Sequence, residues 1–377
     1  SYIKMSNAWP SSGGIAMILQ KAYGPGVVAA SSSLLMALSM VINESLVART
    51  FAAYALRPFG QEENALFLSI LALALIVFAY FVNASGNRSV SGFSLIMSVI
   101  KVGGIVVFAV AAIWASGFFS GAFSEDISQS GGGAFLASVA FSILAFKGFT
   151  TITNSGGDIV DPHRNVGRTI VISIVICVVT YLLVALAVGA SLTISEIAQA
   201  RDYSLAAAAR PALGQLGFWF TIVIALSATT SGVIASVFAV SRMLAMLTDM
   251  KMIPHSHFGM KGGIRSHMLV YTVVVAGSLA VLFDLSRIAS LGAFFYLVMD
   301  MLVHWGVYRH LRKEIAAKSS VLLAAIAADG VVLAAFTATK LDTDPFIVGI
   351  AAALIAVVFA LEALFLRQIG GKNDNPG

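Results

Sequence analysis

This chain contains ten long apolar segments, and they restrict the folds that it can adopt. We place them at residues 27–56, 65–84, 93–119, 134–157, 169–192, 216–248, 268–283, 288–308, 319–339 and 346–366. Nearly all of them reach the roughly 20 residues that a helix needs to cross a bilayer. With 59% hydrophobic and only 11% charged residues, the chain lacks the polar surface of a soluble protein of 377 residues. The sequence therefore predicts an all-α integral membrane protein with about ten spans.

The basic residues predict how these spans are oriented. If the loop after Lys21 is cytoplasmic, most Lys and Arg residues outside the spans also fall on the cytoplasmic side, and the acidic residues lean to the other side. This is the asymmetry that the positive-inside rule describes. The net charge of +5 then belongs to the cytoplasmic loops, so we do not interpret it as binding of nucleic acid. The same alternation places the C-terminus in the cytoplasm.

The sequence carries no motif of enzymatic chemistry. It contains no P-loop, no HExxH and no GxSxG pattern, so we expect no enzyme, no catalytic residue, no metal and no cofactor. Without a P-loop, any transport has to be driven by an ion gradient or by exchange of solutes.

One stretch differs from the other spans. Residues 132–170 read GGAFLASVAFSILAFKGFTTITNSGGDIVDPHRNVGRTI, an apolar half, then the Lys147–Gly148 pair, then a polar half and a short basic loop. This pattern is typical of the discontinuous helices of transporters. We expect the second half to start near Phe149, where its free N–H groups can receive a carboxylate. The carbonyls freed at 145–147 can receive an amine, so the break suits a zwitterion.

Two lysines inside spans are candidate functional residues, because a charge in the membrane costs several kcal/mol on insertion scales. Lys101 lies roughly 12 Å deep at 1.5 Å per residue. A buried lysine can gain and lose a proton near neutral pH, which suits proton coupling. The alternative is that its stem reaches back to the interface. Lys147 lies near the middle of its span, and we leave open whether it contacts substrate or a gating carboxylate, or forms a structural ion pair.

The remaining ionisable residues in spans favour structural interpretations. Glu44 and Arg49 are five residues apart and so do not share a helix face. Asp300 and His304 are four residues apart and can meet on one face. We prefer a polar contact facing the bundle for this pair, with a proton relay as the alternative. Asp329 stands alone in its span, with no evident role.

Four motifs together resemble those of the amino acid–polyamine–organocation (APC) transporters. SILAFKGFTTITNSGGDIVDPHRNVGRTI is similar to their sixth-helix signature, and YIKMSNAWPSSGG (2–14) to the end of their second helix. SVIKVGG (98–104) places Lys101 where family members carry a fifth-helix lysine implicated in proton coupling. SRMLAMLTDMKMIP (241–254) is similar to the exit of their eighth helix.

The resemblance implies a leucine-transporter-type fold of five plus five helices in inverted repeat, followed by two additional C-terminal helices. The ten spans are then helices three to twelve, the first helix is absent, and we expect the sequence to be a fragment truncated at its N-terminus. We expect residues 1–368 to form one transmembrane transporter domain and residues 369–377 a disordered cytoplasmic tail.

The resemblance also assigns candidate site residues. Ala145, Lys147, Gly148 and Thr150 would line the substrate pocket, with Phe146 and Phe149 as gating or packing aromatics. Lys101 would couple the proton. The hydroxyls of Thr229, Thr230 and Ser231 would lie near Lys101 or an ion site.

Two departures from the family pattern bear on the substrate. The family usually has an acidic residue where this chain has Thr150, and neutral residues are common at the position of Lys147. A cation in place of an anion repels cationic substrates in a low dielectric. Neutral or acidic amino acids are therefore the expected substrates.

The sequence-based hypothesis is a proton-coupled amino-acid symporter of the inner or plasma membrane, working by alternating access. Its partners are the substrate, the proton and the lipid bilayer, and the oligomeric state is left open. One alternative is an exchanger of the same fold. The other is a non-transporting receptor or accessory subunit, which the absent first helix would explain.

Overall fold

The structure is a computed structural model in which every described element is a helix or a helical turn. It describes residues 1–11, 13–116, 132–154, 156–200, 203–254, 260 and 262–373; for 87–96 and 369–373 only the backbone is described. Ten helices within these residues are long and apolar enough to cross a membrane, which confirms the predicted all-α architecture.

The described helices and turns occur in the following order along the chain. The first half of the chain contains α1 (Tyr2–Ala8), α2 (Gly14–Tyr23), α3 (Val27–Leu56), η1 (Arg57–Phe59), α4 (Ala65–Ala84), α5 (Asn87–Ser116), α6 (Gly132–Phe146), η3 (Lys147–Phe149), α7 (Thr150–Thr153) and η4 (Gly156–Asp158). The second half contains α8 (Pro162–Ser191), α9 (Ile194–Gln199), α10 (Ser204–Asp249), α11 (Ile264–Leu282), α12 (Leu285–Gly306), the π-helical turn η5 (Val307–Leu311), α13 (Ser319–Thr343) and α14 (Pro345–Asn373).

Most predicted spans coincide with these helices, and the differences lie at the ends. The largest is in α10, which begins twelve residues before the predicted start at 216 because an alanine-rich segment, Ser204 to Gln215, is also helical. The predicted tail begins inside α14, whose backbone is helical to Asn373, and residues 374–377 lie outside the described part of the chain.

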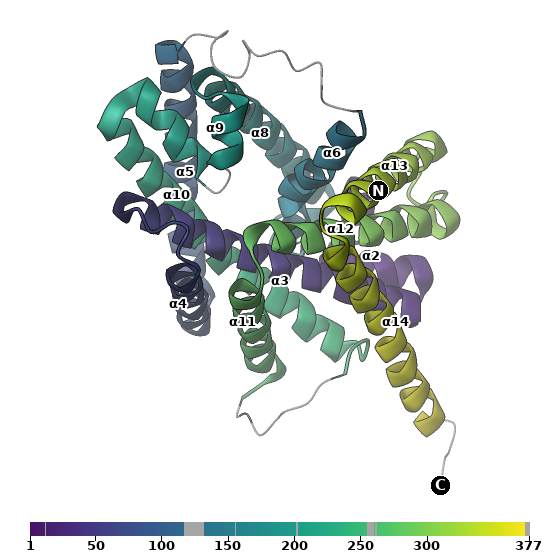
Figure 1. Cartoon of the computed structure of the whole chain (residues 1–377). Coiled ribbons are helices and arrows are strands. Elements are labelled where there is room, and N and C mark those ends of the chain that lie inside the picture. The colour runs from purple at the N-terminus through teal and green to yellow at the C-terminus, as the bar shows by residue number, and fades with distance from the viewer. Residues whose placement is uncertain are drawn as a thin grey trace.

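Helices α3 and α12 form the centre of the bundle, where they pack against each other (Figure 1). In the most apolar window of each, 72% of the residues are buried, against 11% in α8. Helix α8 is apolar on all sides and suits contact with lipid. Helix α3 instead carries buried polar residues, among them Ser39, Glu44 and Ser45. These polar groups face protein, as intramembrane polar residues generally do.

Polar side chains define several helix starts. The side chain of Asn64 accepts hydrogen bonds from the backbone of Leu66 and Phe67 at the start of α4. Asp284 accepts one from the backbone N–H of Arg287 at the start of α12. Such caps satisfy amide groups that have no partner within the helix.

Helix α10 is bent at Gly214, whose φ of 66° and ψ of −155° are not helical. A positive φ is readily adopted by glycine, and Pro211 nearby cannot donate a backbone hydrogen bond. The bend divides the helix into a short N-terminal arm and a long arm that crosses the bundle.

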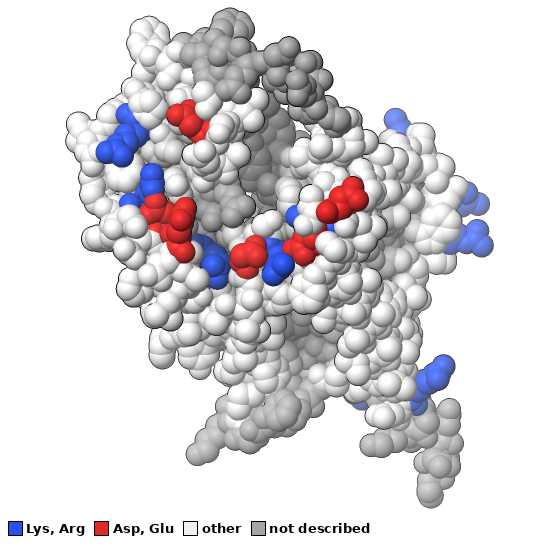
Figure 2. Space-filling model, viewed as in Figure 1, with Lys and Arg blue, Asp and Glu red and all other residues white. Residues whose placement is uncertain are grey.

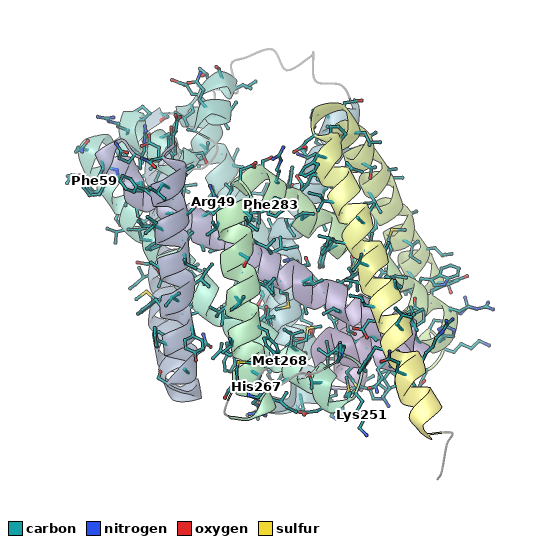
Figure 3. All side chains as sticks on the ribbon, turned by 60° about the horizontal axis from the view of Figure 1, so that its bottom comes forward. Arg49, Phe59, Lys251, His267, Met268 and Phe283 are labelled. Carbon is teal, nitrogen blue, oxygen red and sulfur yellow. The ribbon has the colours of Figure 1, made fainter. Side chains whose placement is uncertain are left out.

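The two ends of the bundle differ in their side chains. Figure 3 shows Arg49, Phe59 and Phe283 at one end, and Lys251, His267 and Met268 at the other. On the face drawn in Figure 2, acidic and basic side chains follow the edge of a hollow in a curved band.

Candidate functional site

The segment from α6 to α7 crosses the bundle as a continuous helical path with a tightened middle. The backbone at Phe146 (φ −81°, ψ −14°) and Thr150 (φ −64°, ψ −26°) stays in the right-handed helical region. The N–H of Thr150 is bonded to carbonyls of the preceding turn. The prediction of an unwound break with free N–H groups near Phe149 is therefore wrong for this structure. A 3₁₀ turn keeps i→i+3 hydrogen bonds, so the chain tightens at Lys147–Phe149 without opening.

The carbonyls around this turn do accept additional donors, but these donors are hydroxyl groups of the protein. Thr150 Oγ1 donates to the carbonyl of Lys147 at 2.7 Å, and Thr153 Oγ1 donates to that of Thr150 at 2.6 Å. The hydroxyl of Tyr181, on α8, donates to the carbonyl of Ala145 at 3.2 Å. The threonines in the polar half of the motif therefore stabilise the 3₁₀ turn by hydrogen bonds to its carbonyls.

Lys147 points its ammonium group toward the central helix α3. Its Nζ donates to the backbone carbonyl of Ser39 at 2.5 Å and lies 2.9 Å from Ser39 Oγ. The side chain is only 4% exposed, and it interacts electrostatically with the fully buried Glu44. Its Nζ also lies 6.0 Å from the ring centroid of Tyr296 on α12. Lys147 thus contacts both central helices, and it has a buried carboxylate nearby.

Two small cavities flank the 3₁₀ turn. One, of about 100 Å³, lies toward α3 and α10 and is lined by Lys147, Thr150 and Ser236 among others. The other, of about 230 Å³, lies toward α8 and includes Phe149. Ala145 and Gly148 line both cavities. Because these two residues have small side chains or none, little side-chain volume separates one cavity from the other.

The two phenylalanines of the motif contact different neighbours. The ring of Phe146 packs edge-on against Tyr181, with centroids 5.0 Å apart. The ring of Phe149 packs edge-on against Tyr2 of α1, also at 5.0 Å. Phe149 therefore joins the turn to the segment that resembles the end of a second helix.

Lys101 lies half-buried on α5, which packs against both α8 and α10. It interacts electrostatically with Cys177 on α8, a residue that lines the cavity of about 230 Å³. The predicted hydroxyl residues lie on α10: Thr229, Thr230 and Ser231. Thr229 Oγ1 bonds to its own helix, at the carbonyl of Ala225 (2.7 Å). Among the described residues, no hydrogen bond joins Lys101 to this group.

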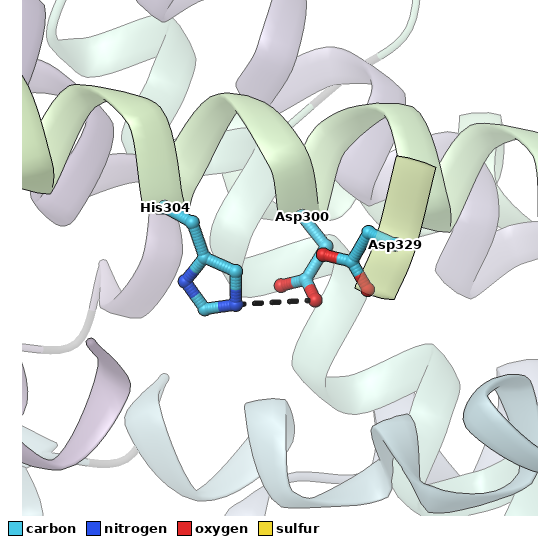
Figure 4. Close-up of side chains that lie close together, drawn as sticks. All are labelled: Asp300, His304 and Asp329. Carbon is cyan, nitrogen blue, oxygen red and sulfur yellow. Dashed lines mark ion pairs between the residues drawn. The ribbon is translucent and has the colours of Figure 1, made fainter. Parts of the chain in front are cut away.

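Sequence reasoning missed a buried polar cluster formed by Asp300, His304, Asp329 and Tyr2. Figure 4 shows that the first three lie together, with Asp329 reaching across from α13. His304 Nε2 is 3.6 Å from Asp300 Oδ2, which confirms that the two share a helix face. The view of Asp329 as solitary is wrong, because its partner lies on another helix. No local sequence pattern predicts a contact between two helices. An aspartate within a span does, however, indicate that a polar partner is needed on a neighbouring helix.

A larger polar basin lies at the end of the bundle that holds Arg49. It has a volume of about 680 Å³ and is lined by Arg49, Glu62, Glu63, Tyr203 and Asp284 among others. Its lining carries both charge signs, with Arg49 as well as Glu62, Glu63 and Asp284. Its size falls within the range of small-molecule sites, roughly 300–1,000 Å³.

Comparison with known proteins agrees with the resemblance. The profile of the amino acid permease family matches residues 1–339. The chain is 28% identical over 257 residues to the inner membrane transport protein YbaT of Escherichia coli, which covers 67% of this chain and 59% of YbaT. It is 28% identical over 306 residues to the uncharacterized protein MJ0609 of Methanocaldococcus jannaschii, covering 80% of this chain and 69% of that protein.

A match to a family profile over most of the chain assigns the family, and the helical fold with its ten spans agrees with that assignment. The chain spans about 59% of the length of YbaT, and it belongs to the amino acid permease family of the APC superfamily.

Proposed function

We propose that this protein is a secondary active transporter that imports neutral or acidic amino acids together with protons, by alternating access. The observation that carries the proposal is the buried Lys147 on the 3₁₀ turn of α6, with a cavity on either side of the turn. An irregular turn of a spanning helix, next to a cavity and a buried charge, is where transporters bind solutes.

The substrate site in this proposal is the region around the turn. Ala145 and Gly148 line both cavities and leave space for a ligand, while Thr150 and Lys147 offer polar contacts. Phe146 and Phe149 close the region toward α8 and α1. The cavities of about 100 and 230 Å³ are smaller than typical ligand sites, so substrate entry requires the helices to move apart.

The charge at the site favours neutral and acidic substrates. Lys147 places an ammonium group where related sequences commonly have a neutral residue, and Thr150 stands where they usually have an acidic one. In a medium of low dielectric, this charge repels a cationic side chain and attracts a carboxylate. The carboxylate of Glu44 offsets part of this effect, which keeps neutral amino acids among the proposed substrates.

Lys101 is the proposed proton carrier. Its position between α5 and α8 connects it, through Cys177, to the cavity beside Phe149. Thr229, Thr230 and Ser231 are proposed to support that site or an ion near it from α10. A change in the charge of Lys101 would alter the contact between these helices, and so couple protonation to their movement.

Uptake into proteoliposomes tests this proposal. Radiolabelled alanine, glutamate and arginine are supplied outside, with an inward proton gradient or with none. Coupled transport predicts accumulation of alanine or glutamate that requires the gradient and stops with a protonophore. Lys101→Ala should abolish gradient-driven accumulation, while Lys313→Ala, which removes an exposed lysine, should not. Exchange of internal for external substrate that ignores the gradient would establish an exchanger instead.

We also propose that the protein resides in the inner or plasma membrane with its C-terminus in the cytoplasm. The relative YbaT is described as an inner membrane protein, and the basic residues favour this orientation. A reporter that is active only in the cytoplasm, fused after residue 377, should be active. A reporter that is active only outside should be silent at that position.

A further inference from the structure

We propose that Asp300 and Asp329 form a carboxyl pair that holds one shared proton, and that release of this proton is a second coupling step of transport. The transport part rests on the proposed function, while proton sharing by the pair stands on the geometry of the cluster. The site lies between α12, α13 and α1, away from Lys101 on α5.

The first support is the arrangement of the two carboxyl groups. One oxygen of each carboxyl group and one ring nitrogen of His304 all lie within 4.8 Å of one another (Figure 4). Asp300, His304 and Asp329 are each more than nine-tenths buried. Two carboxylates in contact in an apolar interior cannot both stay ionised, so one of them retains a proton.

The second support is a buried oxygen without a donor. Oδ2 of Asp329 is inaccessible to solvent and has no hydrogen-bond partner among the described residues. An unsatisfied carboxylate oxygen in the interior is costly, and a proton on the pair removes that cost. No Lys or Arg side chain in the described part of the chain forms an ion pair with either aspartate.

The groups that surround the pair are polar but largely neutral. From α1, the hydroxyl of Tyr2 donates to Asp300 Oδ1. From α12 itself, Tyr296 and His304 face the pair. Ser1 Oγ lies 2.6 Å from His304 Nδ1.

Charged groups on the other helices packed against α12 are engaged elsewhere. Lys147 on η3 is bonded to Ser39 of α3 and reaches only the ring of Tyr296 on this side. Glu44 of α3 interacts with Lys147, and Glu362 of α14 lines a separate apolar cavity. None of these three groups forms an ion pair with either aspartate among the described residues.

The position of the pair explains how its proton can be linked to transport. Tyr2 is hydrogen-bonded to Asp300, and its ring packs against Phe149 of the proposed substrate site and, at 5.8 Å, against His304. When the proton leaves, the second carboxylate becomes charged and competes for the Tyr2 hydroxyl. The proton enters from one aqueous compartment, resides on one of the two carboxyls and leaves to the other, so no further reactant is required.

Infrared difference spectroscopy and transport assays test the proposal together. The variants are Asp329→Asn and Asp300→Asn, with Asp342→Asn as a matched control because Asp342 is an exposed carboxylate on the same helix. At neutral pH, the carbonyl stretch of a protonated carboxylic acid should be present in the parent protein and in the control. Its intensity should fall in Asp329→Asn, while other buried carboxyl groups such as Glu44 and Glu362 account for the remainder. If both variants at the pair keep the full intensity of the parent protein, the pair holds no proton and the proposal is overturned.

The transport arm uses the labelled amino acids above in proteoliposomes. Asp329→Asn should lower gradient-driven accumulation at least tenfold and leave exchange of internal for external substrate within about twofold. Asp329→Glu, which keeps a carboxyl group, should restore part of the accumulation and so distinguishes lost coupling from a folding defect. If Lys101→Ala abolishes accumulation and Asp329→Asn does not, proton coupling through Lys101 stands and the second coupling step is refuted.

Thermal unfolding with Mn²⁺ or Zn²⁺ tests whether the cluster of Asp300, His304 and Asp329 binds a metal ion instead of a proton. Stabilisation by either ion that disappears in Asp329→Asn would identify a metal site and overturn the proposal. If the parent protein accumulates no substrate under any gradient, the proposed proton-coupled function fails, and the infrared result alone decides whether the pair holds a proton.

Discussion

The ammonium group of Lys147 donates to the backbone carbonyl of Ser39, 2.5 Å away on the central helix α3. Ser39 Oγ in turn donates to the carbonyl of Gly292 on α12, at 3.1 Å. One lysine therefore ties the 3₁₀ turn to the two most enclosed helices of the bundle. If the 3₁₀ turn moves, these hydrogen bonds must break, or α3 and α12 must move with it.

Removal of the ammonium group should destabilise the protein through the carboxylate that it leaves behind. Lys147→Ala removes the charge-assisted hydrogen bonds to Ser39, which contribute about 1.5–3 kcal/mol each, and leaves Glu44 buried without the positive charge near it. The Glu44→Gln, Lys147→Met double variant should recover part of that loss, since no lone charge remains. Thermal unfolding in detergent measures both effects, and a double variant no more stable than Lys147→Ala would exclude the pair.

The same double variant tests the charge selectivity of the site. Without the ammonium group, arginine should compete with alanine at least tenfold better than in the parent protein, because the repulsion of cationic side chains is removed. Competition for uptake in proteoliposomes measures this ratio. An unchanged ratio would mean that Lys147 does not select the substrate, whatever its structural role.

Two neighbouring glycines should respond very differently to alanine. A Cβ at Gly14, which has a φ of +47°, would lie 2.8 Å from the backbone nitrogen of Asn154, just after α7. Strain of that kind costs about 1–3 kcal/mol. A Cβ at Gly13 would meet only the flexible end of Met246, which can move aside. Gly14→Ala should therefore lower the melting temperature clearly more than Gly13→Ala, and equal shifts would contradict the close approach of α2 to α7.

The ion pair between Arg287 and Asp344 should contribute stability that depends on pH. Arg287 Nε donates to Asp344 Oδ2 at 2.8 Å, and this hydrogen bond lowers the pKa of the carboxyl group below its usual 3.8. A lowered pKa means that the contribution is present above the unfolded value and is lost as the pH falls through the folded one. Asp344→Asn should thus be less stable than the parent at pH 7, with the difference shrinking below about pH 4. A difference in melting temperature that stays constant over this range would contradict the assignment.

The spans were predictable because each one is a long run of apolar residues, and length alone identifies such a helix. The ends were less certain where a charge, a proline and a glycine interrupt the apolar run without ending the helix, as at Arg210, Pro211 and Gly214 of α10. The 3₁₀ turn was located correctly by the Lys147–Gly148 pair, but its conformation was not. The Thr150 hydroxyl satisfies the carbonyl of Lys147, and composition does not show whether a threonine will support a turn or line an opening. The Asp300–Asp329 contact joins two helices, so no periodicity in either sequence segment encodes it.

The bend at Gly214 has a mechanical consequence. A straight helix of 46 residues would be about 69 Å long, more than twice the thickness of a bilayer's hydrocarbon core. The bend separates the first ten residues, Ser204 to Leu213, as a short arm that is joined to the rest of α10 at Gly214, a residue without a side chain. Tyr203 precedes the start of this arm. The central carbon of the guanidinium group of Arg57, just beyond α3, lies 4.1 Å from the centroid of the Tyr203 ring. We expect a tilt of α3 to reach the N-terminal arm of α10 through this contact, and the bend at Gly214 to let that arm turn separately from the long arm.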